Sequence, residues 1–203
     1  LTEAVDLVRL QDEAASLIPS EDVMPELQGQ YMYFQRHTLD GFVQFCRHPE
    51  NQPQAEEVIL DTSLLAKETG FADVTACKVS DDHKLLAYIV DFTGDDSLEL
   101  RLQPLGTCAF AETVSVPSIR SVEFLGKTEN VVNLLAVRTD PTTKRANHVL
   151  HLTVTDEHVS ERVLWNEPNP AAYLELFRTK NRKLILASSN TKDTSLVCFA
   201  PCG

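Results

Sequence analysis

The chain contains residue types that could perform chemistry, but not in the spacings that the chemistry needs. A hydrolase serine sits on a strained turn such as G-x-S-x-G, and none of the seven glycines among the 203 residues brackets a serine. Neither G-x-x-x-x-G-K-[ST] nor G-x-G-x-x-G occurs, so the sequence offers no phosphate-binding loop. We therefore predict no catalytic residue, no cofactor-binding residue and no cofactor for this chain.

The candidate metal ligands are equally scattered. His148 and His151 are three residues apart in a strand-like run, which sends their side chains to opposite faces. The acidic run Asp91–Glu99 has the oxygen ligands that Ca²⁺ prefers, but a hairpin turn with solvated carboxylates explains it better than an EF-hand loop. Cys198-x-x-x-Cys202 lacks two further ligands. We predict no metal site, and we expect the five cysteines to be reduced and mostly buried.

Charge excludes two classes of partner. Lys and Arg number 18 against 30 Asp and Glu, so the formal charge is −12 and the pI is about 4.9. Nucleic acids and anionic membrane surfaces bind cationic patches, so neither is an expected partner. The longest apolar run, Leu85–Val90, is far shorter than the roughly twenty residues of a membrane span. The sequence opens at Leu1 without an initiator Met, as a cut end would, and shows no targeting segment; it also contains no Asn-x-Ser/Thr sequon, and we expect a cytoplasmic location.

The elements that would position any site are almost all strands. An amphipathic helix is expected over Thr2–Leu17, ended by Pro19, and a second short helix over Thr62–Glu68. From Tyr31 onward, short runs rich in Val, Leu, Phe and Tyr alternate with turn residues, and Trp165 is expected in the core. The predicted strands are Tyr31–Arg36, Phe42–Arg47, Glu57–Asp61, Thr75–Ser80, Leu85–Phe92, Leu98–Gln103, Glu112–Val116, Ser121–Leu125, Val131–Thr139, His148–Thr155, Arg162–Asn166, Tyr173–Arg178, Lys183–Ser189 and Ser195–Phe199.

These strands group into a repeat. Sets of strands open at Thr75, Ser121 and Tyr173, separated by 46 and 52 residues, and the first two sets contain four strands each. Four strands per unit of this length is the signature of a β-propeller blade, and it favours a propeller over a β-sandwich. We predict an all-β fold: a helix and linker over residues 1–28, then about three and a half blades over residues 29–203. Such a ring cannot close, so we expect the chain to be part of something larger or to pair with another copy.

Short motifs in the first half of the chain resemble a known family. Three segments resemble, in order, motifs in the opening propeller strands of the prolyl oligopeptidase family of serine peptidases. Gly29–Arg36 is similar to G-x-Y-x-Y-Y-x-R, Phe45-Cys46-Arg47 to Y-C-R, and Glu56–Asp61 to E-x-V-L-L-D. The likeness continues along the chain: Val79–Asp82 is similar to that family's V-S-P-D-G motif and Leu85–Tyr88 to its L-A-Y motif. Asp91 and Gly94 then follow at similar places. The overall likeness is closest to the oligopeptidase B branch.

The chain also departs from the family pattern. Pro and Gly are missing from the S-P-D-G turn, Asp96 stands where Glu is common, and Val122-Glu123-Phe124 replaces W-x-x-D. Beyond Val116 the likeness is reduced to strand spacing. These departures indicate a divergent member whose substrate preference, basic residue or proline, is left open.

The resemblance implies a parent protein that joins a seven-bladed propeller to an α/β-hydrolase domain. That domain carries the Ser-Asp-His triad and cleaves short peptides, while the propeller filters access to it. On this reading the chain is a non-catalytic fragment of a cytoplasmic serine oligopeptidase. Its expected partners are the hydrolase domain and short peptides, with no catalysis by the chain alone.

Two other readings stay open. A stand-alone β-rich module could recruit a protein partner by strand addition at exposed blade edges. Alternatively, two copies of a half propeller could associate to close one ring.

Overall fold

The computed structural model describes residues 24–106, 114–128, 130–155 and 158–202. The chain divides into two compact units, Leu1–Asp61 and Thr62–Gly203. The helix expected over Thr2–Leu17 lies outside the described residues.

The first unit contains one antiparallel sheet of four strands in sequence order. These strands are β1 (Glu26–Gln28), β2 (Tyr31–His37), β3 (Val43–Pro49) and β4 (Glu57–Asp61). The sequence predicted three strands here and missed β1, because three residues are too few to show an alternating pattern. A tight turn containing Gly29, whose φ is 59°, returns β1 onto β2. We call this sheet blade 1.

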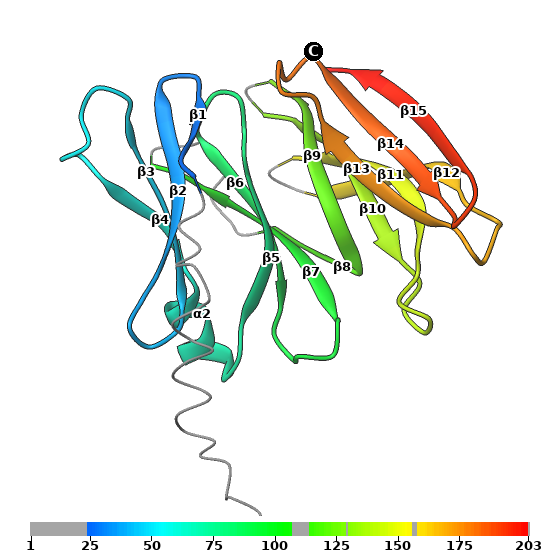
Figure 1. Cartoon of the computed structure of the whole chain (residues 1–203), viewed down its shortest axis with the longest axis horizontal. Helices are drawn as coiled ribbons and strands as arrows, with labels where there is room; N and C mark the ends of the chain where they lie inside the picture. Colours follow the sequence, from blue (N-terminus) through cyan, green and yellow to red (C-terminus); the bar gives the residue numbers. More distant parts are fainter. Residues whose placement is uncertain (1–23, 107–113, 129, 156–157, 203) are drawn as a thin grey trace, which may run out of the picture. The chain divides into compact units, whose positions relative to one another are not determined.

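The second unit begins with the predicted short helix, α2 (Thr62–Thr69). Gly70 ends it at a φ of 90°, and its amide donates to the Ala66 carbonyl oxygen at 2.7 Å. Three antiparallel sheets follow, again with their strands in sequence order (Figure 1). We call them blade 2, blade 3 and blade 4. Blade 2 has β5 (Asp73–Val79), β6 (Leu85–Asp91), β7 (Leu98–Pro104) and β8 (Val114–Pro117); blade 3 has β9 (Ile119–Lys127), β10 (Val132–Thr139), β11 (Ala146–Val154) and β12 (Val159–Asn166); blade 4 has β13 (Tyr173–Arg178), β14 (Leu184–Asn190) and β15 (Ser195–Pro201).

This architecture confirms the predicted all-β fold of a partial propeller. Most strand ends lie within two residues of the prediction. The largest difference is β12, which begins at Val159 instead of Arg162, because Ser160 and Glu161 are exposed and polar and leave Val159 without an apolar alternation. Residues 112 and 113 of the strand predicted over Glu112–Val116 lie outside the described residues.

The core of the second unit lies between neighbouring blades. The apolar run Leu85–Val90 forms most of β6, which is buried on both faces. One apolar cluster joins blade 2 to blade 3, with Ile89 and Leu134 among its members, and a second joins blade 3 to blade 4, with Val137 and Leu174. Trp165, predicted to lie in the core, is partly buried and packs against the second cluster. The blades are therefore held by their faces, and their first strands, β5, β9 and β13, approach one another along one side.

Candidate functional site

The most concentrated set of interacting charges lies where the first strand of each blade in the second unit turns into the second. In blade 2 this turn runs from Ser80 to Leu85, and in blade 4 it runs from Thr179 to Leu184. Both segments read [ST]-x-[DN]-x-K-L. Both turns place their fourth residue in the left-handed region, with φ of 60° at His83 and 58° at Arg182.

Hydrogen bonding is also the same in the two turns. The Ser80 hydroxyl donates to Asp82 Oδ1 at 2.6 Å, and the Thr179 hydroxyl donates to the side-chain oxygen of Asn181 at 2.7 Å. Each hydroxyl in turn accepts from the amide of the leucine that opens the second strand, at 3.0 Å and 3.1 Å. The two turns are therefore one structural motif repeated two blades apart.

Asp81, at the second position of the blade 2 turn, pairs with two arginines of blade 4. Arg182 donates from Nε and Nη2 to Asp81 Oδ1 at 2.9 and 2.7 Å, and Arg178 Nη2 donates to Oδ2 at 2.7 Å. The Arg178 side chain is 6% exposed and that of Asp81 is 53% exposed. Burial raises the pKa of Asp81, but hydrogen bonds from both arginines outweigh it and hold the pKa below its ordinary value.

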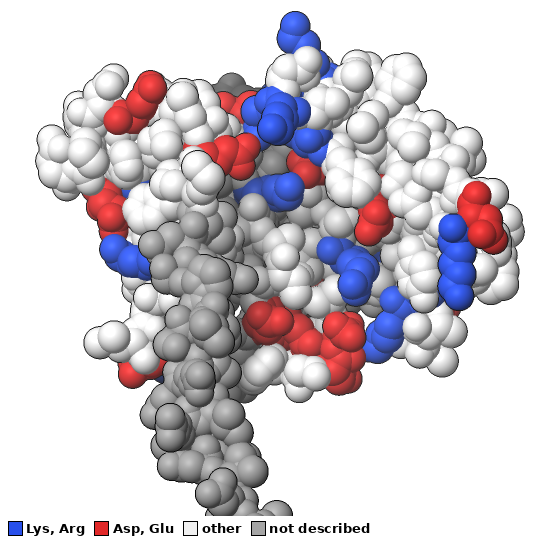
Figure 2. All heavy atoms as spheres, viewed as in Figure 1, with Lys and Arg blue, Asp and Glu red and all other residues white. Residues whose placement is uncertain are grey.

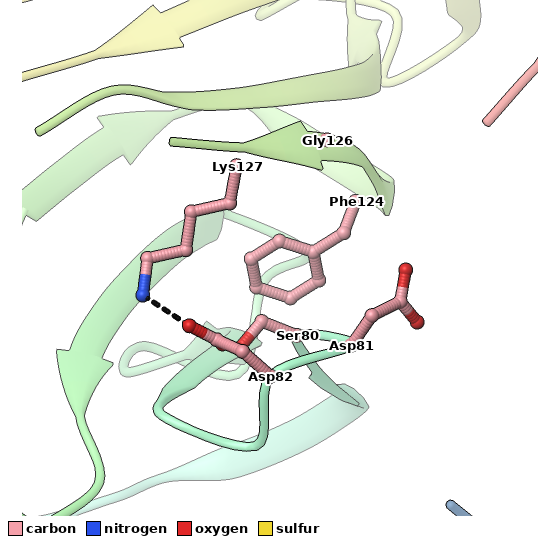
Figure 3. Close-up of a pocket in the computed structure, with 6 residues that line it drawn as sticks. All are labelled: Ser80, Asp81, Asp82, Phe124, Gly126 and Lys127. Atoms are coloured by element: carbon pink, nitrogen blue, oxygen red, sulfur yellow. Dashed lines mark hydrogen bonds and ion pairs between the residues drawn. The ribbon is translucent and has the colours of Figure 1, made fainter. Parts of the chain in front are cut away.

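Asp82 pairs instead with blade 3. Lys127 Nζ, at the end of β9, donates to Asp82 Oδ2 at 2.7 Å. Figure 3 shows these two side chains pointing toward each other beside the Phe124 ring, with Asp81 pointing away from Lys127. Burial raises the pKa of Asp82, but the bonds from Lys127 and Ser80 dominate and lower it.

A cavity of about 150 Å³ opens at this turn. Its lining is mixed: the buried ring of Phe124, carboxylates and one ammonium group. The lining residues are Ser80, Asp81, Asp82, Phe124, Gly126 and Lys127.

The charged turns hold two carboxylates and three cations in ion pairs. The Ser80 hydroxyl, which donates to Asp82, also accepts from the Leu85 amide, so it is used within its own turn, while the ion pairs join the blades. Arg178 Nη1 is buried without a hydrogen-bond partner, which makes the Arg178 charge depend on Asp81. On the face shown in Figure 2, both acidic and basic side chains are present.

The family-like motifs of the first unit form a separate cluster around Arg47. Its guanidinium carbon lies 4.8 Å from the centre of the Tyr31 ring, and its Nε donates to Glu57 Oε2 at 2.9 Å. Burial lowers the pKa of Arg47, but its bonds to Glu57 and Tyr33 outweigh that effect and raise it. These motif residues therefore fasten β2, β3 and β4 together.

The acidic run considered for calcium forms a hairpin turn. Asp91 Oδ1 accepts from the amides of Thr93 and Gly94 at 2.8 and 2.9 Å, and Oδ2 accepts from the amide of Asp96 at 2.8 Å. The Asp91 carboxylate thus accepts hydrogen bonds from the backbone amides of its own turn.

The histidines considered as metal ligands bond to asparagine. His148 Nδ1 lies 2.7 Å from Asn147 Oδ1, and His151 Nε2 lies 3.0 Å from Asn133 Oδ1. No group of three or more His, Cys, Asp or Glu residues in the described ranges is placed to hold a metal ion. Within the same ranges, no helix has the length and apolar character to cross a membrane.

Sequence reasoning used Asp81 and Asp82 only as part of a family-like turn motif and missed the partners of their carboxylates. Arg178, Arg182 and Lys127 are far away along the chain, so no local pattern joins them to Asp81 or Asp82. The recurrence of [ST]-x-[DN]-x-K-L at residues 80 and 179 was the available signal.

Comparison with known proteins places these features in context. Residues 8–202 match the family described as the N-terminal β-propeller domain of prolyl oligopeptidase. A curated relative, Protease 2 of Moraxella lacunata, is 25% identical over 199 residues. The match covers 87% of this chain and 26% of the relative.

Two solved structures share the fold over 97% of the chain. Oligopeptidase B from Leishmania major gives a TM-score of 0.72 at 22% identity and is covered over 28% of its length. Oligopeptidase B from Trypanosoma brucei with covalently bound antipain gives a TM-score of 0.70 at 20% identity and is covered over 29%. The chain thus spans between 26% and 29% of the length of these relatives.

Proposed function

The chain belongs to the family of N-terminal β-propeller domains of prolyl oligopeptidases, and on this premise we propose that it gates the access of short peptides to a hydrolase domain of the same protein. The chain itself supplies no catalytic group in this proposal. The serine-type catalytic residues lie in the part of the parent protein that it does not span, and the parent acts in the cytoplasm. The observation that carries the proposal is the family match over residues 8–202.

The free face of blade 4 supports an incomplete ring. Tyr173 and Phe177 alternate along β13 with Leu174 and Leu176, which are buried against blade 3. On β15, Phe199 is in register with Phe177 through Leu186, and Val197 is in register with Glu175 through Ser188. The exposed fractions are 56% for Tyr173, 49% for Phe177, 53% for Val197 and 72% for Phe199.

Such an apolar sheet face has the character of the faces that join blades 2 to 3 and 3 to 4. Leaving it in water costs free energy and invites aggregation. A further blade of the parent protein is the occupant that the proposal requires.

The proposal is tested on the native protein. An antibody raised against this chain should detect, in a lysate of the source organism, a band several times larger than 22.6 kDa. The immunoprecipitate should react with a fluorophosphonate probe and cleave a short fluorogenic peptide, but leave a folded protein intact. A 22.6 kDa band without a labelled hydrolase would overturn the proposal, and equal cleavage of the folded protein would overturn the gating role.

The second candidate is an interaction module, favoured by the same exposed face and by the edge strand β15. In this case the native band is at 22.6 kDa and a protein partner adds a strand at the β15 edge. Self-association of two copies is the third outcome. A dimer mass for the native protein by light scattering identifies it.

A further inference from the structure

Asp81 makes a direct contact between two blades that are not neighbours. It lies in the β5–β6 turn of blade 2, whereas Arg178 and Arg182 lie 97 and 101 residues later, at the end of β13 and in the β13–β14 turn of blade 4. The close packing of strands across blades runs instead through blade 3. There β9 contacts β5, β6 and β7, and β13 contacts β9, β10 and β11.

Both oxygens of the Asp81 carboxylate are used in this contact. Arg182 approaches Oδ1 side-on with two donors, and Arg178 binds Oδ2 with one. Three charge-assisted bonds, two on Oδ1 and one on Oδ2, leave the carboxylate little freedom to turn. A single flexible lysine would not restrain the two turns in the same way.

The Arg178 side chain is also held by its own turn. Its Nε and Nη2 donate to the Arg182 carbonyl oxygen at 3.3 and 3.2 Å. Arg178 is therefore fixed to the backbone of the β13–β14 turn, and any movement of that turn is passed to Asp81. Because the Arg178 side chain is 6% exposed, it has little water available to replace a lost carboxylate.

The two apolar interblade clusters lie on either side of blade 3 and can act as pivots. Apolar contact is not directional, so small rotations of one blade on another cost little. A polar clasp between the first-strand turns of blades 2 and 4 removes that freedom. We propose that Asp81, Arg178 and Arg182 form a latch that fixes the separation of these two turns and so the curvature of the three-blade array.

The latch is a property of the second unit and does not depend on the proposed peptidase function. Its release would let the first strands of blades 2 and 4 move apart while both apolar interfaces stay intact. A competing carboxylate or high salt would favour the released form, because it weakens the exposed Asp81–Arg182 contact first.

Hydrogen exchange measured by mass spectrometry on the 203-residue chain tests the latch. In Asp81→Asn, the amides of both turns should exchange about tenfold faster than in the unmodified chain. The informative amides are those of His83, bonded to the Ser80 carbonyl oxygen, and Arg182, bonded to the Thr179 carbonyl oxygen. The amides of the central strands β6 and β10 should be unchanged.

The matched control removes one carboxylate charge, as Asp81→Asn does, but from an ion pair that lies within a single blade. Glu161 of β12 accepts two bonds from Arg138 of β10, at 2.7 and 2.6 Å. Glu161→Gln removes this pair, and it should leave exchange in both latch turns as it is.

The milder variant Arg182→Gln covers the case in which Asp81→Asn does not fold. It keeps the Arg178–Asp81 bond and should give a smaller rise in exchange at both turns. In either variant, unchanged exchange in the β13–β14 turn overturns the latch. For Asp81→Asn, a rise confined to the β5–β6 turn also overturns it, because it shows that Asp81 serves only its own turn.

Discussion

Asp81 shows how one carboxylate takes its properties from side chains far away in sequence. Its two arginine partners lower its pKa against the opposing effect of burial. Arg178 is the more dependent partner, because it is nearly buried and one of its nitrogen atoms, Nη1, has no hydrogen-bond acceptor. The network therefore links the charge state of an exposed acid to the packing of blade 4.

This link makes the stability contribution of Asp81 depend on pH. A carboxylate whose pKa is lowered by folding stabilises the fold above its unfolded pKa, 3.8, and loses that effect as pH falls through the folded value. We expect Asp81→Asn to lower the free energy of unfolding by about 1 kcal/mol at pH 7. Urea unfolding at pH 7 and pH 3 measures this, and the difference between variant and unmodified chain should shrink at pH 3.

The control for this experiment is Asp193→Asn, an exposed acid in the turn between β14 and β15. It should change stability little at either pH. A deficit of the Asp81→Asn variant that is equally large at both pH values would contradict the role assigned to the charge.

Cysteine reactivity follows burial in the same way. Burial raises the pKa of Cys77 to about 12 and also raises that of Cys46, which is 1% exposed, whereas Cys198 is exposed. The thiolate is the reactive form, so iodoacetamide at pH 8 should modify Cys198 first and leave Cys46 and Cys77 until the chain unfolds. Peptide mass spectrometry over time measures the order. Early modification of Cys77, which is only partly buried, would contradict this order.

At the scale of elements, the central strands of each blade carry most of the burial. Leu134 of β10 is 0% exposed and belongs to the cluster that joins blades 2 and 3. Edge strands such as β12 contribute less, since Val163 is 56% exposed. Stability should therefore fall off from the middle of each sheet toward its outer edge.

Leu134→Ala tests this gradient. It leaves a cavity between two blades, and we expect a loss of about 3 kcal/mol in the free energy of unfolding. Val163→Ala on β12 should cost less than about 0.5 kcal/mol. Urea unfolding of the two variants makes the comparison, and similar losses in both would mean that the interface between blades 2 and 3 is poorly packed.

At the scale of the whole molecule, the open feature is the free face of blade 4. Tyr173, Phe177, Val197 and Phe199 form an apolar patch of the kind that soluble chains rarely leave uncovered. The isolated chain should therefore associate with itself and bind an apolar dye at this face.

Phe199→Ser should reduce both effects, because Phe199 is the most exposed member of the patch. Sedimentation velocity at several concentrations and dye fluorescence measure the change. Leu39→Ser is the matched control: Leu39 is fully exposed in the turn between β2 and β3, and its loss should change neither. If the two variants behave alike, the patch is not the site of association.

The sequence by itself determined the fold class of this protein. Alternation of apolar residues and turn residues located all but one of the described strands, and the spacing of Thr75, Ser121 and Tyr173 revealed the blades. Such patterns are local, because a strand needs only its own residues to show which face is apolar. The motifs around Arg47 and Asp91 identified the family for the same reason, since each motif builds one turn or one group of neighbouring strands.

Tertiary structure alone decided which charges meet. Arg178 and Asp81 are 97 residues apart, and only the stacking of three blades brings their turns together. It also decided that Tyr173 and Phe177 stay exposed while Leu174 and Leu176 of the same strand are buried, because burial depends on which face meets a neighbouring blade. The strand β1 was also decided by tertiary structure. Its three residues are too few to show a pattern, and they form a strand because they pair with β2.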